Sequence, residues 1–171
     1  MKLLQIDKVR YRKHLNMASV VATAVLIVFA LIYGQILIHF FAPADGNNFK
    51  LNLVGVILGV ISLLVVFNQI RHHPYLTEVM YVWDLKQANN QIYRKLHKIK
   101  SALSASDNTN IDAITILNYY YAASKQQYNL DNNTLTMDSL TADIAKLDNL
   151  IAEKNLTISV DDYHQDLLKQ F

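Results

Sequence analysis

The sequence of 171 residues contains no cysteine. This absence excludes a disulfide framework, a thiolate nucleophile and a thiolate metal site. Glycine and proline are scarce, with four and two residues, and all of them lie within the first 74 residues. Residues 75–171 therefore have neither helix breaker, which favours long helices joined by turns of Asn, Asp, Ser and Thr.

Two long runs also lack Asp, Glu, Lys and Arg, namely residues 17–41 and 51–70. A helix needs ~20 apolar residues to cross the ~30 Å hydrocarbon layer of a membrane. We therefore predict an all-α protein with transmembrane helices at 17–41 and 51–71, joined by an external loop at 42–50. A basic cytoplasmic segment, 1–16, precedes this hairpin, and a cytoplasmic domain of about three helices, 72–171, follows it.

Basic residues predict the orientation of the hairpin. They flank its two ends at Lys8, Arg10, Arg12, Lys13 and Arg71, whereas the loop holds one Lys. The positive-inside rule then places both termini in the cytoplasm, and in a bacterium the protein would lie in the inner membrane. The same five residues are predicted to contact anionic lipid headgroups. A cleaved signal peptide is the alternative for the first run, but this run is much longer than the ~7–15 residues of a signal core.

Small residues recur at spacings of three or four residues on both runs: Ala30, Gly34, Gly55, Gly59 and Ser62. Such residues let helix backbones approach closely in lipid. If the hairpin folds about Gly46, Gly34 lies near Gly59 and Ala30 near Ser62. The matched depths favour a seam within one chain over a seam between two copies, although glycine is also simply common in membrane helices.

Apolar stripes with 3-4 spacing predict the cytoplasmic helices. The first helix, from about residue 74 to 103, carries Val82, Leu85, Asn89, Ile92, Leu96, Ile99 and Leu103. The second runs from a cap at 109 or 110 to about 128, with Ile111, Ile114, Leu117 and Tyr121 on one face. The third carries Leu140, Ile144, Leu147 and Ile151.

The charges of these helices differ in sign. Residues 1–100 hold twelve Lys or Arg and four acidic residues, whereas residues 101–171 hold four Lys and ten acidic residues. We therefore expect the basic first helix to pack against the acidic third helix in an antiparallel three-helix arrangement. The tail after Leu156 is compatible with either a strand or a short amphipathic helix.

The sequence has no P-loop, HExxH or GxSxG motif, and we predict no cofactor, no small-molecule substrate and no catalytic residue. His72 and His73 are the only weak candidates for a metal site. Adjacent helical residues point about 100° apart, however, so headgroup anchoring fits this pair better. The basic run 94–100 could suggest nucleic acid, but anionic lipid or the acidic helix is the more economical partner. Trp83 and Tyr93 fit core packing or headgroup contact.

The stretch NQIRHHPYLTEVMYVWDLKQANNQIYRKLHKIK, residues 68–100, resembles the family catalogued as domain of unknown function 3087. The segments IDKVRYRKHLN, LNLVGVILG and YNLDNNTLT are also similar, so the resemblance covers nearly the whole chain. It implies a bacterial two-span membrane protein with a helical cytoplasmic part. It implies no activity and transfers no functional residue.

These features predict a non-enzymatic, membrane-anchored interaction protein, an accessory subunit or scaffold. Its expected partners are membrane lipids and either another membrane protein or a second copy, and not nucleic acid. The alternative is a small membrane metal protein or enzyme that uses His72 and His73. A pore or transporter is a third possibility, against which the nearly unbroken apolar character of both spans argues.

Overall fold

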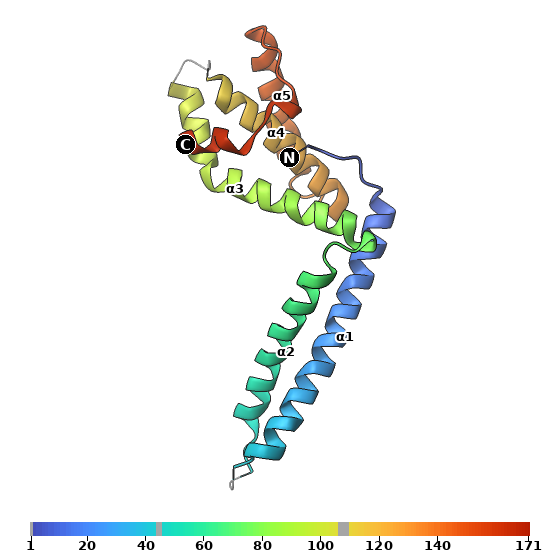
Figure 1. The fold of residues 1–171 in the computed structure, drawn as a ribbon. Helices are drawn as coiled ribbons and strands as arrows, with labels where there is room; N and C mark the ends of the chain where they lie inside the picture. The colour runs from blue at the N-terminus through green and yellow to red at the C-terminus, as the bar shows by residue number, and fades with distance from the viewer. Residues whose placement is uncertain (1, 44–45, 106–109) are drawn as a thin grey trace. The chain divides into compact units, whose positions relative to one another are not determined.

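A computed structural model describes residues 2–43, 46–105 and 110–171 (Figure 1). Within these ranges the regular structure consists only of helices, which confirms the predicted all-α class. The α-helices are α1 (Lys8–Phe41), α2 (Phe49–Ile70), α3 (Thr77–Ala105), α4 (Ile111–Asp131) and α5 (Met137–Glu153). Short 3-10 helices are η1 (Pro74–Leu76), η2 (Val160–Asp162) and η3 (Gln165–Gln170).

The chain divides into two compact units. Val9–Met80 forms one, which we call the hairpin unit. Met1–Lys8 and Tyr81–Phe171 together form the other, which we call the helical unit. The predicted change from span to domain at residue 72 thus differs from this division, which keeps residues 72–80 with the hairpin.

The hairpin unit contains two helices, α1 and α2, that are long and apolar enough to cross a membrane. Its turn uses Gly46, whose φ of 72° favours glycine and whose N–H donates to the Pro43 carbonyl. The first helix ends at Phe41, as its apolar run does, but it begins at Lys8. Residues 8–16 of the predicted basic segment are therefore helical and add nine residues, ~14 Å of helix, to the apolar run.

A capped turn separates α2 from α3. His73 has an extended backbone, and its Nδ1 accepts a hydrogen bond from the Tyr75 N–H. Pro74 then occupies the first position of η1, where its fixed φ is favourable and its missing N–H costs nothing. The Thr77 hydroxyl donates back to the Pro74 carbonyl at the start of α3.

The helical unit is built around α4. Asn110 caps this helix by accepting from the Ala113 N–H, and Asn132, in the left-handed region with φ 57°, ends it. The other proposed cap, at residue 109, lies outside the described residues, as does part of the predicted break before α4. Five consecutive residues, 113–117, are buried, so α4 is enclosed on all sides and not on one face. Ile111, predicted on the buried face, is 55% exposed.

The two ends of the chain complete the core of the helical unit. No strand occurs in the described part of the tail after Leu156, where η2 begins at a Ser159 capping box and η3 follows it. Tyr163, Leu167 and Leu168 of this tail return to the hydrophobic core. At the other end Leu3 packs against the same core.

Candidate interaction surfaces

The small residues of the hairpin unit lie in one close seam between α1 and α2. A Cβ atom added to Gly55 would stand 2.7 Å from the Gly34 nitrogen and 2.8 Å from its Cα. At Gly59 an added Cβ would lie 3.1 Å from the Ala30 nitrogen. Ser62 meets Tyr33, with 2.8 Å between the two hydroxyl oxygens.

The pairing along this seam differs from our prediction by one helical turn. Gly34 faces Gly55, not Gly59, and Ala30 faces Gly59, not Ser62. The prediction centred the hairpin on Gly46, but α1 ends at Phe41 and α2 begins at Phe49, so the centre lies earlier in the chain. The same small residues then meet in a shifted register, because residues four apart share one helix face.

The antiparallel pairing continues beyond the apolar runs. The His14 and Tyr75 rings lie 3.9 Å apart between centroids, and the Arg10 guanidinium forms an ion pair with Glu78. The Glu78 side chain is only 11% exposed. From Gly34 down to Arg10 on α1, the partners advance by nearly equal steps from Gly55 to Glu78. Contacts between the two antiparallel segments of the hairpin unit therefore continue from its turn through η1 into the first turn of α3.

The residues predicted to contact headgroups have different surroundings. Arg10 is bonded to Glu78, and the exposed Arg71 donates through Nε to His72 Nε2. Lys8 and Lys13 are exposed, whereas Arg12 is half-buried. Of this set Lys8 and Lys13 have the clearest access to solvent or lipid.

His72 and His73 serve local structure. Both are exposed; the first accepts from Arg71 and the second caps η1. Among the described residues no three His, Asp or Glu side chains gather in a way that could hold a metal ion. The geometry thus gives these residues a role in the turn and brings no further ligand to them.

The predicted apolar stripes occupy the core of the helical unit. On α3 the buried members are Val82, Leu85, Asn89, Ile92 and Ile99, with Leu96 and Leu103 half-buried. On α5 they are Leu140 and Leu147, with Ile144 and Ile151 half-buried. The shared partner of both helices is α4: Asn89 Nδ2 donates to Ser124 and Gln127, and α5 packs on α4 (Figure 1).

The expected charge pairing of α3 with α5 is reduced, within the described ranges, to one ion pair. Lys100 Nζ lies 3.3 Å from Asp143 Oδ2. Desolvation lowers the pKa of Lys100, but its contacts with Tyr121 and Asp143 outweigh burial, so that this pKa is raised. The prediction paired α3 with α5 and not with α4, because the buried residues of α4 surround the helix and do not form a one-sided stripe.

The Lys and Arg residues of α3 fall into two groups. Three have partners: Lys86 with Asp131, Lys95 with the Leu168 carbonyl, and Lys100 with Asp143. Arg94 and Lys98 are exposed, and in the part of the chain that the structure describes neither has a hydrogen-bond or ion-pair partner. Trp83 and Tyr93 of the same helix are also exposed.

Tyr119 is the most strongly perturbed titratable group of the helical unit. It is fully buried and stacks on Tyr163 with 4.1 Å between ring centroids. Burial, together with the neighbouring Tyr163 and Tyr81, raises its pKa to about 12. Its hydroxyl has no hydrogen-bond partner among the described residues. The arrangement is one of packing, since the ring has no access to solvent.

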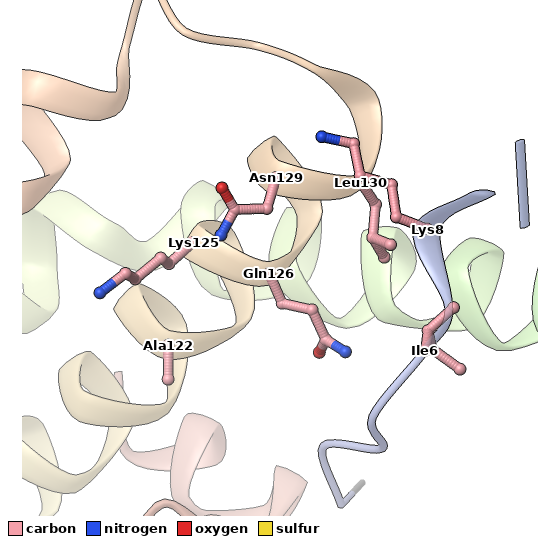
Figure 2. A pocket seen from close by; sticks show the side chains of 7 residues that line it. All are labelled: Ile6, Lys8, Ala122, Lys125, Gln126, Asn129 and Leu130. Carbon is pink, nitrogen blue, oxygen red and sulfur yellow. The ribbon is translucent and has the colours of Figure 1, made fainter.

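An open groove of about 410 Å³ runs along the last turns of α4 (Figure 2). Its lining combines aliphatic side chains with two ammonium groups and two amides: Ile6, Lys8, Ala122, Lys125, Gln126, Asn129 and Leu130. Figure 2 shows Gln126 pointing from α4 toward the extended segment that carries Ile6. The groove is suited to a small group with negative charge and an apolar part.

Sequence reasoning missed the attachment of residues 2–8 to the helical unit. The Leu4 N–H donates to the Tyr81 hydroxyl, which donates in turn to Gln126 Oε1. Gln126 Nε2 then donates to the Leu4 carbonyl and closes the ring of hydrogen bonds. The three bonds join residues 45 to 122 positions apart, and no periodicity in the sequence indicates them.

Comparison with known proteins gives one match. The family described as "Protein of unknown function (DUF3087)" matches residues 1–168, in agreement with the resemblance noted from the sequence. No curated protein and no solved structure gives a significant match.

Proposed function

This chain belongs to the DUF3087 family, and because that family carries no assigned function, we propose one from the geometry: a membrane-anchored, non-enzymatic interaction protein. The hairpin unit anchors it in a membrane, the inner membrane in a bacterium. The helical unit acts in the cytoplasm as an accessory subunit or scaffold. Its partner is another membrane protein or a second copy of the chain.

The exposed apolar surface of the hairpin unit carries the anchoring role. Val20, Leu31 and Leu64 are 66%, 61% and 61% exposed, and apolar side chains surround both helices. In water such a surface would aggregate, whereas in hydrocarbon it is solvated.

The hydroxyl groups of the two apolar runs support the same environment. The runs contain four hydroxyl side chains, and each has a bonding partner within the unit. Ser19 and Thr23 donate to the carbonyls four residues earlier, and Tyr33 and Ser62 bond to one another. A medium without water requires such hydrogen bonds within the protein, because an unpaired polar group there costs several kcal/mol.

The distribution of charge supports the cytoplasmic location and the interaction role. Basic residues lie at both open ends of the hairpin, as the positive-inside rule requires of cytoplasmic ends. Beyond α3 the chain is acidic, and Asp138, Asp148 and Glu153 of α5 are exposed. The helical unit thus offers an acidic surface on α5 and a basic one on α3 for binding other molecules.

The absence of cysteine allows a clean test of anchoring and orientation. Single variants Asn47→Cys, in the loop, and Thr157→Cys, in the tail, are treated in intact cells with a membrane-impermeant thiol reagent. We expect Asn47→Cys to react at once and Thr157→Cys only after permeabilisation. Extraction of the protein by alkaline carbonate would contradict anchoring, and the reverse labelling pattern would contradict the orientation.

The interaction role is tested by purification from native membranes in mild detergent, followed by measurement of the particle mass. We expect either a second protein in stoichiometric amount or a defined oligomer of this chain. A monomer that carries only lipid would contradict the proposal. Purification of a chain truncated to residues 1–80 is the control, because it retains the hairpin unit and lacks the proposed interaction surface.

A further inference from the structure

Within the helical unit, one side of α3 is left uncovered. The core side of this helix packs on α4, and Gln91 and Lys95 bond to the tail at Gln165 and Leu168. The remaining side, which we call the outer face of α3, is exposed along its length. It consists of Trp83, Arg94, His97 and Lys98, and at its edge Asn90 and Tyr93 line an open hollow with Tyr120 and Tyr128 of α4.

The outer face combines exposed aromatic side chains with exposed cations that have no partner among the described residues. Trp83 is 54% and Tyr93 62% exposed, although both are large aromatic residues. Arg94 and Lys98 are the two α3 cations without a partner among the described residues. The face itself contains no carboxylate; Asp84 lies at its edge, beside the tail residues Tyr163 and Gln165.

We propose that the outer face of α3 binds the anionic headgroup surface of the membrane that holds the hairpin unit. Trp and Tyr favour the interface between hydrocarbon and water, where an aromatic ring and a polar tip are both satisfied. Arg and Lys favour anionic headgroups for their charge. A lipid surface meets both requirements at once, whereas an acidic protein surface accounts for the cations alone.

The connection along the chain supports this partner. Only residues 71–76 separate the end of α2 at Ile70 from the start of α3 at Thr77. Trp83 lies less than two helical turns beyond Thr77. This short connection tethers the start of α3 to the end of α2, so the proposed membrane would present headgroups to it at a high effective concentration. This inference rests on the proposed anchoring and adds a lipid-binding surface to it.

Trp83 is the only tryptophan of the chain, so the wild-type protein reports on this face without a label. The full chain is reconstituted into nanodiscs of zwitterionic lipid, with or without a third of anionic lipid, and Trp83 quenching by neutral acrylamide is measured. We expect anionic lipid to lower the quenching constant and to shift the emission to shorter wavelength. High salt should reverse both changes, because it screens headgroup charge.

A double variant, Arg94→Gln with Lys98→Gln, tests the cations. Each basic residue near an anionic surface changes the contact equilibrium by about fivefold, so the pair should weaken it about thirtyfold. Trp83 should then be as accessible in anionic as in zwitterionic discs. Lys146→Gln with Lys169→Gln is the matched control, because both lysines are exposed and lie off α3, and their substitution removes the same charge. The control should retain the wild-type protection, and circular dichroism should show equal helix content in all variants.

Three results would overturn the inference. Equal acrylamide quenching in both kinds of disc would show that the outer face does not contact lipid. Protection that rises with protein concentration in detergent alone would assign the face to a second copy. Protection that requires a co-purified acidic protein would assign it to that protein. A failure of anchoring is separately visible, since a chain that does not insert does not co-migrate with the discs.

Discussion

Among the glycine-to-alanine substitutions in α1 and α2, Gly55→Ala should separate the two helices most. The new Cβ would lie 2.7 Å from the Gly34 nitrogen and 2.8 Å from the Gly34 Cα. Both atoms are backbone, so no rotamer change relieves the contact. Ordinary contact between such atoms needs about 3.5 Å, and the helices must therefore separate by nearly 1 Å.

The cost follows from that separation. A gap of ~0.5–1 Å removes a quarter to a half of the dispersion energy between facing atoms, and overpacking in a close interface costs about 1–3 kcal/mol. Gly59→Ala should cost less, since its Cβ stands 3.1 Å from the Ala30 nitrogen. Gly34→Ala should cost least, because the nearest atom, 3.0 Å away, is the Asn52 side-chain oxygen, which can rotate away.

The order can be measured as the stability of the closed hairpin. Met17→Cys and Gln69→Cys lie at the open end of the hairpin, and the chain supplies no other thiol. Energy transfer between dyes at these sites is followed in mild detergent during titration with sodium dodecyl sulfate. Gly55→Ala should lower the midpoint most, then Gly59→Ala, with Gly34→Ala near wild type.

A different order would refute the reasoning in a specific way. If Gly59→Ala were the most damaging change, the pairing would follow the register predicted from a fold about Gly46. If all three variants opened at the same midpoint, α1 and α2 would not approach closely at all.

Two further predictions concern buried polar groups. Tyr119→Phe should raise the free energy of unfolding by about 1 kcal/mol near neutral pH, because it removes a buried hydroxyl without a partner among the described residues. The pKa of Tyr119 is raised to about 12 from 10.0, so above pH 10 the unfolded state loses this proton while the folded state keeps it. The free energy of unfolding is therefore unaffected by this group below pH 10 and falls as pH rises toward 12. Denaturation at pH 8 and pH 11 should therefore show an extra loss of ~1 kcal/mol in wild type relative to Tyr119→Phe, and an equal loss in both would be inconsistent with this pKa. Arg10→Ala should cost about 1–3 kcal/mol in thermal or chemical denaturation, since it leaves the largely buried Glu78 carboxylate without its cation; exposed Lys13→Ala is the control, and equal effects would contradict the ion pair.

The sequence predicts the helices of this protein well, because apolar periodicity and capping residues are local signals. The end of α1 at Phe41 and the cap at Asn110 follow from nearby residues. The long helix α3 is predicted to within three residues at either end, because neither glycine nor proline interrupts it.

What the sequence does not reveal is mostly non-local. The apolar run does not indicate that α1 begins at Lys8, because the charged residues 8–13 are held in the helix by antiparallel contacts such as Arg10 with Glu78. The position of α4 at the centre is hidden by its small and polar buried residues, Thr115 and Ser124 among them. The outer face of α3 becomes visible only once the partners of Lys86, Lys95 and Lys100 are known.

The ring of hydrogen bonds around Leu4 has a consequence for the order in which the two units fold during synthesis. Gln126, which binds the Leu4 carbonyl, is synthesised 122 residues after Leu4. At typical rates of synthesis this interval is on the order of 10 s. Both apolar helices leave the ribosome within that time. The helical unit therefore closes around Leu4 only after the hairpin has been made.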